Sequence, residues 1–344
     1  MVRRDMKAII AGGGIGGLVA ALCLHRAGVE VKVYESVSEI QPLGVGINLL
    51  PHSVKILSEL GLDAELAATG VATDQLLYLN KFGQLIWREP RGLAAGYQWP
   101  QYSIHRGRLH LLLLAAVRKR IGTDAVITGC HLESFENHGD KVEARFIDRQ
   151  TGETSAEASG SILIGAEGIH SRVRKVFYPE EKEPRFSGRL LWRGVTEAEP
   201  FLTGRSMFMA GYADRKFVAY PICPHTANTG RSLVNWVADV FVGDAYAGTQ
   251  RDWNREVSSS RVLEHFINWK FDSSDLRCDI PALISGAEKI FEFPMIDRDP
   301  LLRWSFGRVT LLGDAAHPMY PIGSNGASQA ILDARVLTRE ILDK

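Results

Sequence analysis

The feature that most constrains this chain is a glycine cluster between a short apolar strand and a helix near the N-terminus. The apolar run at 8–11 leads directly into Gly12-Gly13-Gly14-Ile15-Gly16-Gly17, and a helical segment follows. In such a unit, Gly12 permits the tight turn, Gly14 lets the backbone approach a pyrophosphate, and Gly17 lets the helix pack on the sheet. The pattern predicts a nucleotide-binding βαβ unit.

The same unit continues with a β-branched strand at 29–34 that ends at Glu35. An acidic side chain about twenty residues after the glycine cluster is where such folds bind the hydroxyls of a ribose. A glycine-rich turn alone also occurs for purely structural reasons. The flanking strands and Glu35 favour the nucleotide-binding interpretation over that alternative.

A second strand–glycine–helix pattern lies near the other end of the chain. The apolar strand at 308–312 runs into Gly313-Asp314, and a loop leads into a helix from about 327. Asp314 can accept hydrogen bonds from sugar hydroxyls, and the loop at 323–326 offers backbone N–H groups to an anionic group. His317 is expected to be a hydrogen-bonded structural residue rather than a base. Two such motifs at opposite ends of one chain indicate a single large cofactor, FAD.

A third motif lies in the middle of the chain. The strand at 162–164 leads to Glu167-Gly168, and the basic residues Arg172 and Arg174 follow. By itself this segment is also compatible with a solvated loop in which Ser171 caps the next helix.

Together the three motifs resemble those of the single-component FAD-dependent aromatic hydroxylases with the para-hydroxybenzoate hydroxylase fold. The resemblance covers nearly the whole chain. It implies an α/β protein with a Rossmann-like FAD/NAD(P)-binding domain and an inserted mixed β-sheet substrate domain. The expected FAD-binding domain is discontinuous, over 1–70, 100–177 and 290–344, with the substrate domain at 71–99 and 178–289. The family continues beyond this point with further helices, so C-terminal helices are expected to be missing.

The resemblance also assigns the cofactor contacts by position. The first motif binds the ADP part of FAD, the aspartate of the Gly-Asp motif binds the ribityl chain, and the middle motif serves both FAD and the nicotinamide coenzyme. An arginine before a long helix contacts the flavin, and Pro321 places its carbonyl near it. The implied cofactor-binding residues are Gly12, Gly14, Ile15, Gly16, Gly17, Glu35, Gly46, Arg106, Glu167, Gly168, Arg172, Gly313, Asp314, Pro321, Gly323, Asn325 and Gly326.

The segments 42–48, 191–195, 233–236 and 294–300 resemble the subgroup of 5-methylphenazine-1-carboxylate hydroxylases within that family. The implied reaction uses NADH or NADPH to reduce the flavin, and a flavin C4a-hydroperoxide then transfers one oxygen atom of O2 to an electron-rich ring. Alternatives are an epoxidase or drug-modifying monooxygenase of the same family, and a flavoprotein without oxygenase activity that has a redox or structural role.

Three side chains of the expected β-sheet are candidates for the substrate. Arg193 can pair with a substrate carboxylate, while Tyr220 and Trp236 can stack on an aromatic ring. The alternative for both aromatic residues is an ordinary place in the core of the sheet.

Composition narrows the possible partners and the compartment. The 40 basic and 40 acidic residues cancel, which removes the bulk electrostatic argument for a nucleic-acid or membrane partner. The four cysteines form no CxxC pair, which favours reduced thiols in a cytoplasmic protein without a metal site, with Cys23 in the core. The segment 2–4, in which Arg3 and Arg4 are basic, precedes an apolar run and imitates a secretory signal, but the glycine cluster argues against one.

Overall fold

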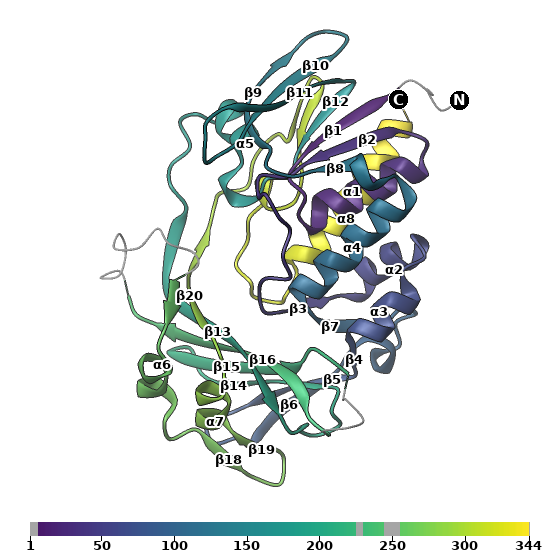
Figure 1. The fold of residues 1–344 in the computed structure, drawn as a ribbon. Helices are drawn as coiled ribbons and strands as arrows, with labels where there is room; N and C mark the ends of the chain where they lie inside the picture. The colour runs from purple at the N-terminus through teal and green to yellow at the C-terminus, as the bar shows by residue number, and fades with distance from the viewer. Residues whose placement is uncertain (1–5, 225–229, 244–254, 344) are drawn as a thin grey trace.

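The computed structural model describes residues 6–224, 230–243 and 255–343. A six-stranded sheet has the order β21-β22-β12-β1-β2-β8 (Figure 1). Neighbours from β22 to β8 are parallel, and β21 is antiparallel to β22. This is the arrangement of a Rossmann-like fold. The bounds are β1 Lys7–Ala11, β2 Glu30–Tyr34, β8 Val126–Ile127, β12 Ile162–Gly165, β21 Ser305–Phe306 and β22 Val309–Leu311.

Helices cover one face of this sheet. The helices α1 (Ile15–Arg26), α4 (Arg106–Arg120) and α8 (Gly326–Leu342) lie side by side, with α2 (Pro51–Glu59) and α3 (Asp63–Thr69) outside them (Figure 1). Their leucine, isoleucine and alanine side chains share one buried core with β1 and β2. The helices expected from the sequence are confirmed to within a few residues.

A three-stranded antiparallel sheet covers the other face. It consists of β9 (His131–Asn137), β10 (Val142–Ile147) and β11 (Thr154–Gly160), in the order β11-β10-β9. The sequence predicts a strand at 142–147 within the cofactor-binding domain. This strand forms as β10, which pairs with its hairpin neighbours rather than with the parallel sheet and packs Phe146 against Tyr34 of β2, with ring centroids 4.2 Å apart.

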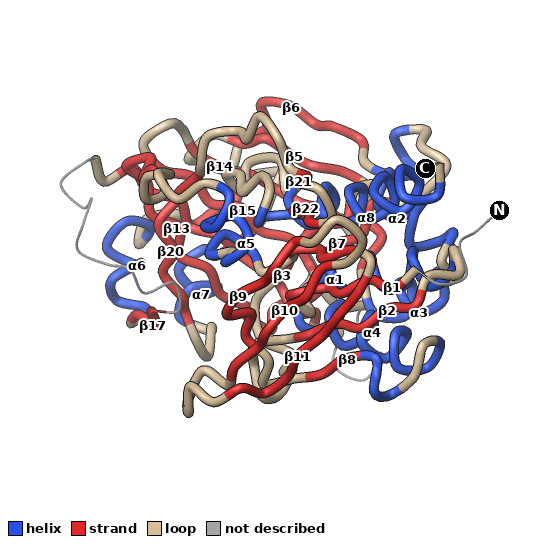
Figure 2. Tube along the Cα trace, turned by 90° about the horizontal axis from the view of Figure 1, so that it is seen from above, coloured by secondary structure: helices blue, strands red, loops and turns tan. Residues whose placement is uncertain are grey.

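The second half of the molecule is built on an eight-stranded sheet with the order β17-β20-β13-β16-β15-β14-β5-β6. α6 (Ser259–Phe266) and α7 (Ile280–Ser285) lie at the face turned away from the parallel sheet (Figure 1), and α6 lies far from α2 and α3 when seen from above (Figure 2). The bounds are β5 Gln75–Leu79, β6 Leu85–Pro90, β13 Arg185–Ala198, β14 Ser206–Gly211, β15 Arg215–Pro221, β16 Ser232–Phe241, β17 Arg255–Val257 and β20 Ile290–Asp297.

The fold class is confirmed, but one segment lies elsewhere than expected. Residues 290–297, placed in the cofactor-binding domain by sequence, form β20 and pair with β13 and β17 of the eight-stranded sheet. Apolar residues at both ends of β20, Ile290 and Met295, are buried. The discontinuous domain boundaries themselves stay a prediction.

A small sheet in the order β3-β7-β4 lies between the two halves. Its strands are β3 (Gly46–Leu49), β7 (Gln101–His105) and β4 (Val71–Thr73). β3 contacts the large sheet through its first residue, Gly46, whose N–H donates to Asn235 of β16, and β7 leads into α4. The remaining elements are β18 (Lys270–Asp272) and β19 (Arg277–Asp279), α5 (Arg172–Phe177), and the short 3-10 turns Gly92–Ala95, Thr123–Ala125, Gly168–His170 and Gly313–Ala315.

None of the helices within the described residues combines the length and apolar content needed to cross a membrane. The segment 2–4, which imitates a signal, lies outside the described residues. Cys23 packs against the helical core as expected, and burial raises the pKa of its thiol to about 12. All four cysteines are free.

Candidate active site

The three sequence motifs meet at one edge of the parallel sheet. Ala11 of β1 is in register with Gly165 of β12, and Gly165 is in register with Leu311 of β22. Because parallel strands end at the same edge, the loops that follow these strands lie side by side. Segments far apart in sequence therefore form one cradle.

The glycines of the first motif fit a bound pyrophosphate. A Cβ on Gly12 would lie 2.3 Å from the carbonyl oxygen of Ala166, and one on Gly17 would lie 2.0 Å from that of Gly12. Only glycine allows these close approaches. At Gly14, by contrast, no protein atom lies within 4 Å of the Cβ position, so the turn is open to a ligand at the N-terminus of α1. Ile15 begins α1.

Two other residues of that motif serve packing in the structure. A Cβ on Gly16 would lie 2.7 Å from Leu312 and 3.2 Å from the Cβ of Ala330, so Gly16 lets α1 pack on α8. The backbone of Gly13 is fixed at both ends. Its N–H donates to Glu35 Oε2 at 2.7 Å, and His110 Nε2 lies 2.6 Å from its carbonyl oxygen. His110 was not singled out from the sequence, because only the packing of α4 on α1 brings it here.

The Gly-Asp loop presents a free carboxylate. Asp314 is exposed, and within the described residues its side chain has no hydrogen-bond partner. The protein atoms around it raise the pKa of the Asp314 carboxyl by desolvation, while the charges of His317 and Arg106 oppose that shift. An unpartnered carboxylate at a strand end fits the hydroxyls of a ribityl chain.

His317 is a structural residue of this loop, as the sequence indicated. Its Nε2 lies 2.5 Å from Asp333 Oδ2 of α8, and the same oxygen accepts a hydrogen bond from the N–H of Gly313 at 3.0 Å. Burial disfavours its charged form, but the Asp333 hydrogen bond and charge outweigh burial and raise the pKa of His317. Asp333 was missed by sequence, since it lies a full loop away from the motif.

The buried side chain of Arg174 holds the same loop by hydrogen bonds. Its Nη1 donates to the carbonyl oxygens of Ala315 at 3.1 Å and Ala316 at 2.8 Å, and its Nε donates to Glu181 at 2.7 Å. Its side chain is only 2% exposed. The sequence grouped Arg174 with Arg172 as basic residues that follow the middle motif, but Arg174 is a buried hydrogen-bonding residue whereas the Arg172 side chain is exposed.

The middle motif is turned inward. Glu167 accepts hydrogen bonds from the hydroxyl of Ser171 at 2.5 Å and the N–H of Arg172 at 3.0 Å, and Ser171 in turn accepts one from the N–H of Arg174. The capping alternative weighed for Ser171 is therefore what the structure shows. Burial raises the pKa of Glu167. Gly168 has φ +79° and is open, while the Arg172 side chain is exposed and donates to the carbonyl of Glu133.

The loop before α8 and the start of α4 complete the cradle. Arg106 begins α4, is exposed, and lies close enough to Asp314 for its charge to oppose the desolvation that raises the pKa of that carboxyl. Gly323 and Gly326 have no atom near their Cβ positions, and the buried Oδ1 of Asn325 has no partner within the described residues. Pro321 is exposed in the same loop.

The eight-stranded sheet faces this cradle with a polar cluster around Gly46. Arg193 Nη2 donates to the Gly46 carbonyl oxygen at 2.7 Å, and the Tyr220 hydroxyl donates to the same oxygen at 3.1 Å. Asn235 Oδ1 accepts from the Gly46 N–H at 2.7 Å. Asn235 was missed by sequence, because only the pairing of β15 with β16, which sets it opposite Tyr220, brings it to this face.

Trp236, a candidate for stacking on the substrate, lies on the wrong face of the sheet. Successive residues of a strand point to opposite faces, so Trp236 points away from the face of Asn235. It is 0% exposed, stacks on Phe217 at 5.7 Å, and donates to Thr196 Oγ1 at 3.1 Å. The alternative of an ordinary core residue describes it correctly.

Burial lowers the pKa of Arg193, while Tyr220 partly opposes that shift and the charge of Arg106 adds to it. Burial also raises the pKa of Tyr220, with Arg193 opposing. The Arg193 guanidinium lies 6.0 Å from the centre of the Phe293 ring. Within the described residues no carboxylate pairs with Arg193, and its Nε is buried without a partner.

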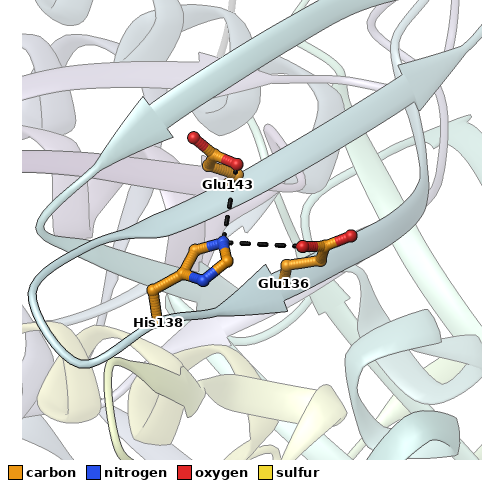
Figure 3. A group of neighbouring side chains, drawn as sticks. All are labelled: Glu136, His138 and Glu143. Carbon is orange, nitrogen blue, oxygen red and sulfur yellow. Dashed lines mark ion pairs between the residues drawn. The ribbon is translucent and has the colours of Figure 1, made fainter.

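One group of side chains elsewhere has the composition of a metal site. His138 Nε2 lies 3.5 Å from carboxylate oxygens of both Glu136 and Glu143 on the β9–β10 hairpin (Figure 3). The His138 side chain is 40% exposed, and Glu143 is also bound by Lys141 at 2.6 Å. Ion pairing on an exposed hairpin accounts for this cluster.

Comparison with known proteins identifies the family. A family model described as an FAD binding domain matches residues 5–343. The phenazine 1,6-dicarboxylic acid hydroxylase of Lysobacter antibioticus is 48% identical over 97% of this chain and 82% of its own length. The chain belongs to this FAD-binding family. It is an FAD-dependent monooxygenase, as the motifs indicated.

Other relatives and structures agree. The 3-hydroxybenzoate 6-hydroxylase 1 of Aquipseudomonas alcaligenes is 33% identical over 97% of this chain and 80% of its own length. The crystal structure of Klebsiella pneumoniae HpxO complexed with FAD and uric acid has a TM-score of 0.79 at 26% identity, covering 98% of this chain and 80% of that one. The open turn at Gly14 and the unpartnered carboxylate of Asp314 fit FAD as the cofactor.

Proposed function

We propose that this monooxygenase hydroxylates a heteroaromatic carboxylate, of the size and charge of a phenazine carboxylate, with NADH or NADPH and O2. The observation that supports this substrate class is Arg193, a largely buried guanidinium without a carboxylate partner among the described residues. Leaving a buried charge unpaired is unfavourable, so an anionic group of the substrate is its natural partner. The likeness to a phenazine dicarboxylic acid hydroxylase supports the same class.

The same face of the sheet offers an apolar wall for the ring. Tyr220 and Ile222 are buried in a cluster with Leu76 and Met207, and Val195 packs against them. In this proposal, Arg193 binds the carboxylate and the apolar cluster holds the ring in a dry pocket beside the flavin. Tyr220 keeps the guanidinium in place through their shared acceptor, the Gly46 carbonyl.

The cofactor residues divide the work by position. The turn at Gly14 and the start of α1 would receive the pyrophosphate, Glu35 the ribose, and Asp314 the ribityl hydroxyls. Arg106 and the loop at 321–326 would contact the flavin ring. FAD, when bound, supplies electron transfer from the nicotinamide and the activation of O2. Apart from the segments assigned to FAD, the described residues show no further strand–glycine–helix unit for the nicotinamide coenzyme, and we propose that this coenzyme binds transiently. Four free cysteines are consistent with a cytoplasmic protein.

The test is NADH and NADPH oxidation by the FAD-loaded protein with and without aromatic acids, with product masses recorded. The panel contains phenazine-1,6-dicarboxylate, phenazine-1-carboxylate, unsubstituted phenazine, 3-hydroxybenzoate and 6-hydroxynicotinate. We expect a phenazine carboxylate to accelerate oxidation and to gain one oxygen atom. Uncoupled oxidation at the same rate with every compound would contradict the proposal and favour a flavoprotein without oxygenase activity.

A variant of Arg193 tests the charge argument. Arg193→Met should raise KM for the carboxylate substrate by about 50-fold or more, because a charge-assisted contact is lost, while KM for unsubstituted phenazine changes little. Arg185→Met is the matched control, since Arg185 is an exposed residue of the same strand. Equal effects on charged and uncharged rings would show that Arg193 does not bind the carboxylate.

A further inference from the structure

Strand β3 is held at two places by parts of the molecule that bind different ligands. Asn235 Oδ1 accepts from the Gly46 N–H at 2.7 Å, while the Gly46 carbonyl accepts from Arg193 and Tyr220. These three side chains come from β16, β13 and β15, so three strands of the large sheet hold the backbone N–H and carbonyl groups of one residue. A Cβ at Gly46 would lie 2.6 Å from both Asn235 and Ile222, so the contact requires glycine.

Two residues farther along, the same strand holds the loop before α8. Asn48 is 1% exposed, its Nδ2 donates to Ser324 Oγ at 3.2 Å, and its Oδ1 accepts from Ser103 at 2.6 Å. Because side chains of a strand alternate, positions 46 and 48 share a face. The backbone N–H of Leu50 adds a hydrogen bond to Ser328 Oγ at 3.0 Å, on α8 itself.

The loop that β3 holds is in an uncommon conformation. Ser324 has φ +56°, in the left-handed region that non-glycine residues rarely adopt. Such a conformation persists only where surrounding contacts enforce it. The Asn48 side chain donates a hydrogen bond to Ser324, and Ser324 lies in the loop at 323–326 that would receive the flavin ring.

From these contacts we infer that Asn235 is a positioning residue for the flavin loop, acting from the substrate sheet through β3. Asn235 fixes Gly46, β3 transmits that position to Asn48, and Asn48 holds Ser324. The buried Nδ2 of Asn235 and Nε of Arg193 have no partner within the described residues. Unsatisfied buried donors at the Gly46 contact mark it as the place where substrate binding at Arg193 can shift β3. This last step and the assignment of the loop to the flavin rest on the proposed function, whereas the contacts between Asn235 and Ser324 through β3 do not.

The link is tested first with FAD alone. Affinities of the apoproteins for FAD are measured by fluorescence quenching for wild type, Asn235→Leu, Asn48→Leu and the double variant. Each single change should weaken FAD binding by about tenfold, the effect of one lost positioning hydrogen bond, and the double variant should be no weaker than the poorer single variant. Additive losses in the double variant would overturn the inference.

A matched control separates positioning from loss of stability. Thr196 lies on the opposite face of the same sheet, where its buried hydroxyl donates to the Leu283 carbonyl and accepts from Trp236. Thr196→Val should lower the urea midpoint as much as Asn235→Leu does, yet leave FAD affinity within about twofold and additive with Asn48→Leu. Asn235→Asp keeps the acceptor oxygen and should retain most of the wild-type affinity. An equal loss of FAD affinity in Thr196→Val would also overturn the inference.

The second test measures flavin reduction by NADH in stopped flow, with and without phenazine-1,6-dicarboxylate. In wild type the ligand should accelerate reduction, and Asn235→Leu should diminish that acceleration about tenfold while ligand affinity changes less than about threefold. Unchanged acceleration in Asn235→Leu would overturn the coupling. Absence of acceleration in wild type would instead contradict the proposed substrate, and the FAD measurements would still decide the link.

Discussion

At the scale of single residues, Asp314 is the side chain whose surroundings point most directly to the cofactor. Asp314→Ala should weaken FAD binding at least about 100-fold, because hydrogen bonds between a carboxylate and sugar hydroxyls are charge-assisted. The measurement is the FAD content after dialysis. Asp272→Ala, which removes an exposed partner of Arg277, is the control. Full retention of the yellow flavin in Asp314→Ala would refute the assignment.

Arg174 makes a different prediction, for stability. Arg174→Met removes a buried guanidinium and leaves Glu181 and two loop carbonyls without their donor, which should lower the free energy of unfolding by about 3–5 kcal/mol. Lys175→Met, at the exposed neighbouring position, should change it by less than about 0.5 kcal/mol. Urea denaturation of both variants checks this. A loss below about 1 kcal/mol for Arg174→Met would show that the network contributes little.

At the scale of elements, different glycines of the first βαβ unit should serve stability and FAD binding. Gly17→Ala would place a methyl group 2.0 Å from the Gly12 carbonyl oxygen, so it should destabilise the apoprotein by about 3 kcal/mol or more. Gly14→Ala meets no protein atom and has an ordinary extended conformation, with φ −70° and ψ −177°. It should leave the urea midpoint unchanged while weakening FAD binding at least about 30-fold. A loss of stability in Gly14→Ala without one in Gly17→Ala would contradict the proposed pyrophosphate site at Gly14.

The pair formed by His317 of the Gly-Asp loop and Asp333 of α8 should make the free energy of unfolding depend on pH. The pKa of His317 is raised in the folded protein, so its stabilising contribution is fully present below the unfolded value of about 6.5 and is lost as pH rises through the folded value. His317→Asn should therefore lower the free energy of unfolding more at pH 6 than at pH 9, by roughly 1–2 kcal/mol. His25→Asn, on the exposed end of α1, is the control. A pH-independent loss would show that the pair with Asp333 is not ionic.

At the scale of the whole molecule, the loops proposed to hold FAD come from the beginning, middle and end of the chain. Because FAD binds only the folded arrangement, FAD at about 100 times its dissociation constant should stabilise the protein by about 2.7 kcal/mol. The thermal midpoint should rise with FAD concentration in wild type. It should not rise over the same range in Asp314→Ala or Gly14→Ala. A rise in those variants equal to wild type would place FAD elsewhere.

The fold of the FAD-binding half of the molecule could be predicted from local sequence patterns. Strand ends followed by glycine, an acidic residue after the second strand, and a Gly-Asp pair are local patterns. Each pattern indicates a property of its own segment. At Gly12 this property is a backbone conformation, and at Glu35 and Asp314 it is a negative charge. The helices α1 and α8 were also predictable, because each follows a strand and a glycine turn within its own segment.

The contacts between these segments and residues distant in sequence are visible in the tertiary structure alone. The sheet pairing turned Trp236 into the core and brought Asn235 to Gly46, since one step along a strand exchanges its two faces. Arg174, Asp333 and His110 support the cradle through contacts distant in sequence, for which no local pattern exists. The same holds for Glu167, whose carboxylate caps its own helix rather than remaining free. Such outcomes depend on how separate elements pack together, and no single segment of the sequence contains that information.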